Sequence, residues 1–129
     1  MQNSPIIFCH YGNSKYLPYV FKWAKISNPN SRIIILGDDA NKKTALKFGI
    51  EHIDFEKYNY GEDIKVFEQV YELITTAGFD SHKHGEDWNK FVFKKWFMLY
   101  NFLEANDIER FWHFDSDNMI FTDLSTLEE

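Results

Sequence analysis

Short unbroken runs of apolar residues alternate along this chain with segments whose apolar residues recur every three or four positions. Unbroken runs are typical of strands buried on both faces, and the spacing of three and four is typical of amphipathic helices. The runs predict strands at residues 6–9, 33–36, 50–55 and 110–114. The spacing predicts helices that contain residues 17–24, 45–48, 67–74 and 88–104. The last helix is expected to be largely buried, because apolar side chains occupy most of its circumference.

The order of these elements predicts the fold class. Strands that alternate with helices favour a mainly parallel sheet with helices on both faces, which is a three-layer α/β sandwich. Gly49 and Gly78 are expected to end two of the helices, and the polar residues 79–87 are expected to form a loop. No linker rich in proline, glycine or serine divides the chain. The sequence therefore predicts one domain over residues 1–129.

Polar segments follow three of the predicted strands, at residues 10–13, 37–39 and 115–117. In open parallel sheets, ligands bind outside the carboxyl ends of the strands. The three segments are therefore expected to meet at one edge of the sheet and to form a binding site there.

Composition and charge narrow the class of protein. The 129 residues carry a net charge of −6 without a long basic run, which argues against a nucleic-acid binder. The single cysteine, Cys9, excludes an internal disulfide and is expected to be a buried apolar residue. Residues 1–9 lack the basic and apolar regions of a signal peptide, and no apolar stretch reaches the length of a membrane span. A cytoplasmic protein is the expectation.

The segment Asp115-Ser116-Asp117 carries the clearest candidate chemistry. In extended chain, residues i and i+2 point the same way, so both carboxylates can face one ligand while Ser116 points to the other side. Two neighbouring carboxylates repel each other, and this arrangement favours a hard divalent cation between them and a phosphate. Mg²⁺ or Mn²⁺ suits such oxygen ligands.

With this motif the sequence resembles glycosyltransferases of the GT-A fold, which hold a metal and a nucleotide-sugar with an Asp-x-Asp at the end of a core strand. Residues 107–121 look like the loop, strand and motif of a bacterial subgroup of these enzymes, and residues 91–103 look like the preceding helix. The opening residues 9–14 and the strand that ends at residues 36–38 are similar to the family's nucleotide-binding start.

The resemblance implies roles for individual residues. His10, Tyr11 and Gly12, with Asp38, would contact the base or ribose of a UDP- or GDP-sugar. Lys95 stands where relatives often carry arginine and would reach the diphosphate or the sugar. Asp115 would contact hydroxyl groups and the metal, and Asp117 would be a direct ligand of Mn²⁺ or Mg²⁺. The protein would then transfer the sugar to an acceptor that the sequence does not identify.

Twelve residues follow Asp117, whereas the family continues with strands that supply the acceptor site and the catalytic base of its inverting members. The chain is therefore expected to correspond to the nucleotide-sugar-binding half of a GT-A domain, apparently truncated. Such a half would expose apolar surface, and a homo-oligomer could cover it. The residues expected in that surface are Met119, Ile120, Phe121 and Leu124.

The sequence also allows other interpretations of these residues and of the function. Asp38 can serve only as a helix cap, and Lys95 can extend from a buried helix without touching phosphate. His82 and His84 are more typical of solvated loop residues than of a metal pair. Phosphatases of the HAD type also carry an Asp-x-Asp after a strand. Their motif lies near the start of the chain, whereas the motif here lies near the end. The main alternative to a glycosyltransferase is a non-catalytic α/β module that binds a nucleotide or a protein.

Overall fold

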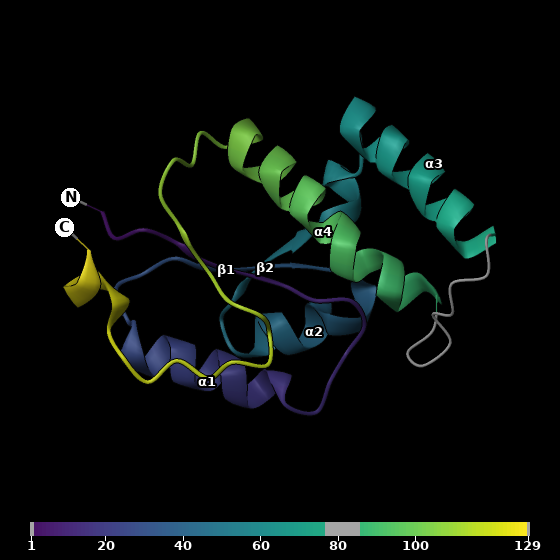
Figure 1. The fold of residues 1–129 in the computed structure, drawn as a ribbon. Coiled ribbons are helices and arrows are strands. Elements are labelled where there is room, and N and C mark those ends of the chain that lie inside the picture. The colour runs from purple at the N-terminus through teal and green to yellow at the C-terminus, as the bar shows by residue number, and fades with distance from the viewer. Residues whose placement is uncertain (1, 77–85, 129) are drawn as a thin grey trace. The chain divides into compact units, whose positions relative to one another are not determined.

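A computed structural model describes residues 2–76 and 86–128 of the chain (Figure 1). The chain divides into two compact units. Unit 1 combines Met1–Asp54 with Ile108–Glu129, and unit 2 consists of Phe55–Asp107. The elements follow one another in the order that the sequence predicts, with two short 3-10 helices, η1 and η2, in addition.

Unit 1 contains a sheet of four parallel strands in the order β3-β2-β1-β4. They are β1 (Ile6–Cys9), β2 (Ile33–Gly37), β3 (Glu51–Asp54) and β4 (Trp112–His113). Ile6 aligns with Ile33 on one side and with Trp112 on the other, so β1 is a central strand. The described residues also form four α-helices. An α/β fold with a parallel sheet is therefore confirmed.

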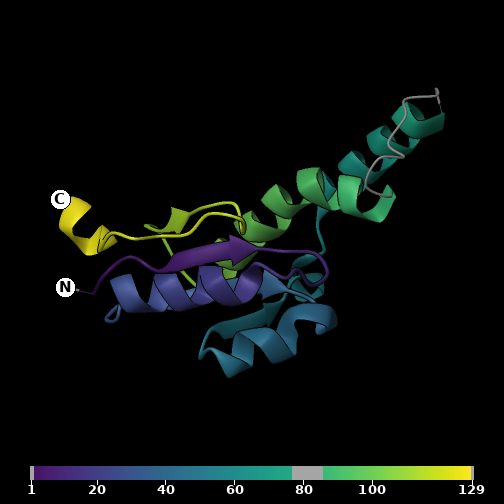
Figure 2. The ribbon, with the colours of Figure 1, turned by 90° about the horizontal axis from the view of Figure 1, so that it is seen from below.

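Two helices cover one face of this sheet. Figure 2 shows α1 (Leu17–Ser27) and α2 (Asp39–Lys47) on the same side of the strands. The buried residues of α1 lie at the predicted spacing and pack with alternate residues of the strands into one core. That core contains Ile6, Phe8, Leu17, Val20, Phe21, Ala24, Ile33, Ile35, Ala45, Ile50, Ile120 and Leu124. The side chains on the opposite face of β1 and β2 are buried as well: Ile7, Cys9, Ile34 and Leu36.

The two outer strands are shorter than the sequence predicts. The strand expected at residues 50–55 ends at Asp54, because Phe55 begins the 3-10 helix η1 (Phe55–Tyr58) and its ring packs 4.8 Å from that of Phe91. The strand expected at residues 110–114 is reduced to two residues, which pair only with Ile6 and Ile7. Its apolar run reflects packing of side chains, such as Phe114 against the core, and not a longer ladder of hydrogen bonds.

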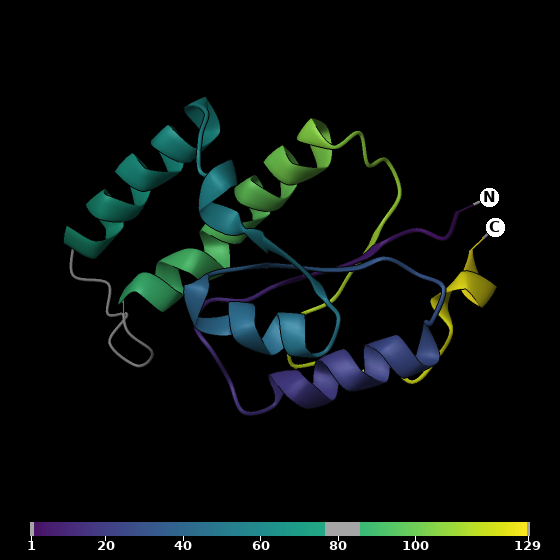
Figure 3. The same cartoon turned by 180° about the vertical axis from the view of Figure 1, so that it is seen from behind.

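The last segment of unit 1 runs back along α1. Ser27 Oγ donates a 2.6 Å hydrogen bond to the carbonyl of Ile120, and Asn28 Nδ2 donates to the carbonyl of Thr122. The segment ends in η2 (Leu124–Leu127), and Figures 1 and 3 show it beside α1. Ile120 and Leu124 are buried in the core, so the prediction that they form exposed apolar surface is wrong. Met119 and Phe121 are exposed, as the sequence predicts.

Unit 2 contains η1 and the helices α3 (Glu62–Thr76) and α4 (Glu86–Ala105). The rings of Phe67 and Phe97 lie 5.5 Å apart, and Glu68 forms ion pairs with Lys90 and Lys94. Partial burial alone would raise the pKa of Glu68, but these two lysines hold that pKa below its ordinary value.

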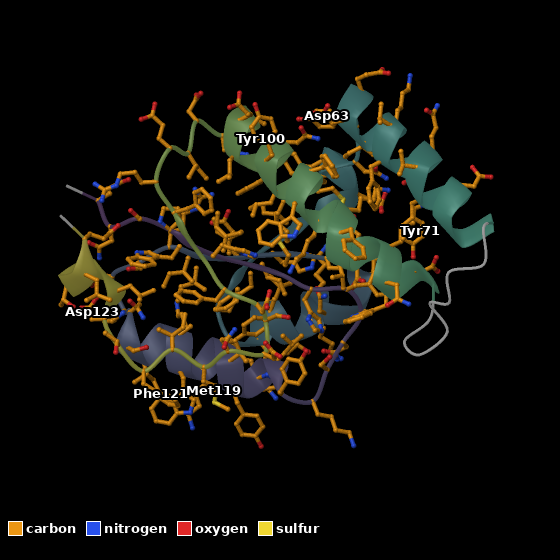
Figure 4. All side chains as sticks on the ribbon, in the orientation of Figure 1. Asp63, Tyr71, Tyr100, Met119, Phe121 and Asp123 are labelled. Atoms are coloured by element: carbon orange, nitrogen blue, oxygen red, sulfur yellow. The ribbon has the colours of Figure 1, made fainter. Side chains whose placement is uncertain are left out.

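The prediction that α4 is largely buried is wrong. Its buried side chains are confined to one stripe that contains Phe91, Met98, Leu99 and Phe102, whereas Phe93, Trp96 and Tyr100 are exposed (Figure 4 labels Tyr100). Gly78, His82 and His84 lie outside the described residues.

Candidate functional site

The loop after β1 and the loop after β4 are joined by one imidazole ring. His10 follows β1 directly, and its backbone N–H donates to the carbonyl of Leu36. Its ring is buried, with Nδ1 2.6 Å from Ser116 Oγ and Nε2 2.9 Å from Ser14 Oγ. Ser116 is the central residue of the acidic motif, so His10 holds that motif against the loop after β1.

The loop after β1 is also tied to the loop after β2. Asp38 is the N-cap of α2, and its Oδ1 accepts hydrogen bonds from the backbone N–H groups of Ala40 and Asn41. Its other oxygen, Oδ2, accepts a 2.7 Å hydrogen bond from the N–H of Gly12. Gly12 has a φ of 75°, in the left-handed region that glycine adopts without strain. The cap interpretation of Asp38 is thus confirmed, and its second oxygen links the two loops.

Two buried or half-buried residues that the sequence analysis does not single out complete this network. The Asn41 amide donates from Nδ2 to the carbonyls of His10 and Gly12, and its Oδ1 accepts from the N–H of Asp38. His52 Nε2 lies 3.0 Å from the same Oδ1 and 2.9 Å from the carbonyl of Asp38. Both neighbours are acceptors, so Nε2 carries the proton. In the sequence, the signal for Asn41 is its amide three residues after Asp38, which is the spacing of a capping box.

The site lies where the chain reverses its direction of travel across the sheet. From β1 the chain moves outward to β2 and β3, and it returns to the other side of β1 as β4. The carboxyl ends of β1 and β4 therefore flank a topological switch point, and open α/β sheets bind ligands at such points. The hydrogen bond between His10 and Ser116 spans this point.

Burial lowers the pKa of His10, and the carboxylates of Asp38 and Asp117 offset this only in part. The ring is therefore neutral at neutral pH, so that one nitrogen donates to one serine hydroxyl while the other nitrogen accepts from the second serine. The edge of the ring also contacts Tyr16, with a centroid distance of 5.8 Å. Asp117 of the acidic motif acts on the pKa of His10 through its negative charge, so the motif and the loop after β1 interact electrostatically as well.

The acidic motif forms a turn. The backbone N–H and the side chain of Asn118 both donate to the carbonyl of Asp115, at 3.1 and 3.2 Å. Asp115 and Asp117 are exposed and Ser116 is buried, although Ser116 and Asp117 lie in a turn and not in the extended chain that the sequence analysis assumes. Ser116 nevertheless contributes more than the sequence suggests, because it holds the turn to His10.

Six of the seven predicted site residues belong to unit 1, and Lys95 belongs to unit 2. His10, Gly12, Asp38 and Ser116 are linked by hydrogen bonds within unit 1, and the exposed Tyr11 lies in the same loop. Lys95 lies on α4 in unit 2, with its Nζ 5.0 Å from the ring centroid of Trp96. Within residues 2–76 and 86–128, no three histidine, cysteine, aspartate or glutamate residues are gathered for a metal ion.

Comparison with known proteins gives no family for the chain. No family model, curated protein or solved structure matches it.

Two surface hollows of unit 1 lie away from the switch point. One of about 420 Å³ is lined by residues that include Ser4, Arg110 and Glu128, and one of about 530 Å³ is lined by residues that include Asn3 and Arg32. Arg32 precedes β2 and Arg110 precedes β4, so both hollows lie at the amino edge of the sheet. The first hollow also contains Glu109 and Glu128, but both oxygens of Glu128 accept from the N–H of Ser4. Ligands of open α/β sheets bind at the carboxyl edge, which favours the switch point over both hollows.

Proposed function

We propose that unit 1 binds a nucleoside diphosphate together with a divalent cation at the carboxyl edge of its sheet. The observation that carries the proposal is the hydrogen bond between His10 and Ser116, which holds the acidic turn at the topological switch point. Loops that are fixed to each other in this way can present several polar groups to one ligand without the cost of ordering them on binding.

The chemistry of the donor groups suits Mg²⁺ or Mn²⁺. Asp115 and Asp117 offer carboxylate oxygens on an exposed turn, and hard cations prefer oxygen ligands. The described residues supply no larger cluster of ligating side chains, so diphosphate oxygens and water would complete the coordination. The cation would neutralise the repulsion between the two aspartates and the diphosphate. Neither ligand is then expected to bind tightly alone.

In this proposal the loops after β1 and β2 contact the nucleoside, and the buried ring of His10 positions the first of them through its bonds to Ser14 and Ser116. His10, Tyr11, Gly12 and Asp38 come from the loops after β1 and β2, which lie next to each other in the sheet. Asp38 already accepts three backbone hydrogen bonds, and it positions the loop of Gly12. Tyr11 is exposed and can stack on a base.

We further propose that the nucleotide carries a sugar, a UDP- or GDP-sugar, and that the domain has the three-layer GT-A architecture. The support for this step is the resemblance of residues 107–121 to the glycosyltransferase motif, together with the parallel sheet that ends in that motif. Transfer of the sugar to an acceptor would make the protein a glycosyltransferase.

Calorimetric titration of UDP and GDP in the presence and absence of Mn²⁺ tests the cation and nucleotide site. Asp117→Asn keeps the shape of the side chain but removes its charge, so we expect it to weaken Mn²⁺-dependent binding at least about tenfold. Glu109→Gln is the matched control, because it removes the same charge from an exposed residue of unit 1 outside the turn. It should leave the affinity unchanged.

Equal nucleotide affinity with and without Mn²⁺, or equal loss in both variants, would contradict the metal site. Turnover assays with nucleotide-sugars then separate the two candidate functions. Release of nucleoside diphosphate in the presence of an acceptor supports the glycosyltransferase, whereas binding without release supports a non-catalytic nucleotide-binding module.

A further inference from the structure

The helix α4 of unit 2 has a second apolar face besides the one that it buries. Phe93 is 59% exposed, Trp96 53% and Tyr100 58%, and Leu103 is half-buried. We call these four residues the α4 seam. The buried Met98 precedes Tyr100 by two positions, which is about 200° around a helix, so the seam lies opposite the buried stripe. Surface helices usually place polar residues on that side.

The spacing of the α4 seam is that of a helix that packs along another helix. From Phe93 to Leu103 its members follow one another by three, four and three residues. Apolar residues that alternate between these two intervals keep one stripe of a helix against a partner helix over successive turns. The seam is about 15 Å long. Among the described helices, α4 included, none is long and apolar enough to span a membrane. A second helix is therefore the occupant whose shape fits.

The two ends of the α4 seam carry opposite charges. Lys90 comes just before the seam and Glu104 just after it, and both occupy the same flanking position of the heptad pattern. Glu68 of α3 forms ion pairs with both Lys90 and Lys94, so this group of three side chains keeps one positive charge in excess. Glu104 is exposed. A fitting partner brings a negative charge to the first end and a positive charge to the second.

We propose that the α4 seam binds the same seam of a second copy of the chain, with the two helices antiparallel. In an antiparallel pair with its two-fold axis near Met98, Phe93 packs against Leu103 of the second copy. Trp96 packs in the same way against Tyr100 of the second copy. Each large ring therefore meets an apolar partner, and the chain itself supplies every group in the contact.

The charges at the ends of the seam select this orientation. In the antiparallel pair, Lys90 of each copy lies at the flanking position that faces Glu104 of the other copy, so both ends are neutralised. A parallel pair would gather the two Lys90 side chains at one end and the two Glu104 side chains at the other. The antiparallel dimer is therefore favoured.

The interface is small, because one helix face of each copy forms it. Small interfaces are typical of weak or transient association, so we expect a dimer that forms as the protein concentration rises. The proposal is independent of the nucleotide site, since the seam belongs to unit 2 and the site residues of that proposal belong to unit 1.

Sedimentation velocity of the full chain at a series of concentrations tests the dimer. Tyr100→Gln should weaken dimerisation at least about tenfold, because it removes an aromatic ring near the centre of the interface and acts twice in a two-fold dimer. Val66→Gln on α3 is the matched control. Val66 is 48% exposed and lies two positions after the buried Ile64, on the outer side of α3. It should leave dimerisation unchanged, and circular dichroism of each variant verifies the fold.

Two charge reversals test the orientation. Glu104→Lys and Lys90→Glu should each weaken dimerisation about fivefold, because like charges then meet at both ends of the seam. A mixture of the two variants should dimerise like the wild type, since every end again pairs a lysine with a glutamate. The fold is expected to tolerate both changes, because lysine is favourable at the carboxyl end of a helix and Glu68 keeps its ion pair with Lys94.

Three results would overturn the proposal. The first is a wild-type chain that stays monomeric at every concentration. The second is a dimer that Tyr100→Gln leaves intact or that Val66→Gln weakens equally. The third is a mixture of the two charge variants that dimerises no better than either variant alone.

Discussion

At the scale of single residues, the candidate site depends on side chains that hold loops to each other. The sequence predicts the ligand-facing groups, because carboxylates and polar loop residues after strands stand out in an apolar pattern. It does not reveal Asn41, which lies inside a helix and is fully buried, or the bond from Ser116 to His10 across 106 positions. Contacts of this kind depend on how β1 and β4 pair, and that pairing leaves no local trace in the sequence.

His10 should make stability depend on pH. Because burial lowers its pKa in the folded protein, the unfolded chain takes up a proton first as the pH falls. The free energy of unfolding should therefore decrease as the pH falls through about 6.5, the ordinary histidine pKa, and level off below the folded pKa. Urea denaturation at a series of pH values measures this. His10→Asn should lack this contribution, and an identical pH profile for the variant and the wild type would contradict it.

At the scale of elements, apolar runs and helical spacing predict β1, β2, α1 and the order of the whole series. They overestimate β3 by one residue at each end, and they fail for β4, where side chains are packed but two residues pair with β1. They also fail for α4, because a helix that is apolar all round can still expose Phe93, Trp96 and Tyr100. An apolar pattern indicates which residues can be buried. Which of them are buried depends on the elements that pack against the helix.

The end of β2 offers a test of local packing. A Cβ on Gly37 would lie 2.1 Å from Asn41 Oδ1 and 2.9 Å from His52 Nε2, so Gly37→Ala should lower the free energy of unfolding by about 1–3 kcal/mol. In the background of Asn41→Ala the main clash is absent, and the same substitution should cost about 1 kcal/mol less. Urea denaturation of the two single variants and the double variant measures the difference. Strictly additive effects would show that Asn41 does not confine Gly37.

At the scale of the whole molecule, the sequence predicts a parallel α/β fold and the meeting of polar loops at one edge. It does not give the strand order β3-β2-β1-β4, and that order is what places His10 and Ser116 on either side of a switch point. Nor does the apolar pattern show that the segment after the acidic turn runs back along α1 and buries Ile120 in the core. Both features arise only when distant segments are assembled.

The central claim is that the ligand binds at the carboxyl edge of the sheet, and chemical-shift mapping of the ¹⁵N-labelled protein with Mg²⁺ and UDP or GDP tests it most directly. The expected result is a set of shifted amide signals from Gly12 and from the turn at Ser116, Asp117 and Asn118, only when cation and nucleotide are both present. The contradicting result is a set of shifts confined to the amino edge, around Arg110 and Glu128, or no shifts at all.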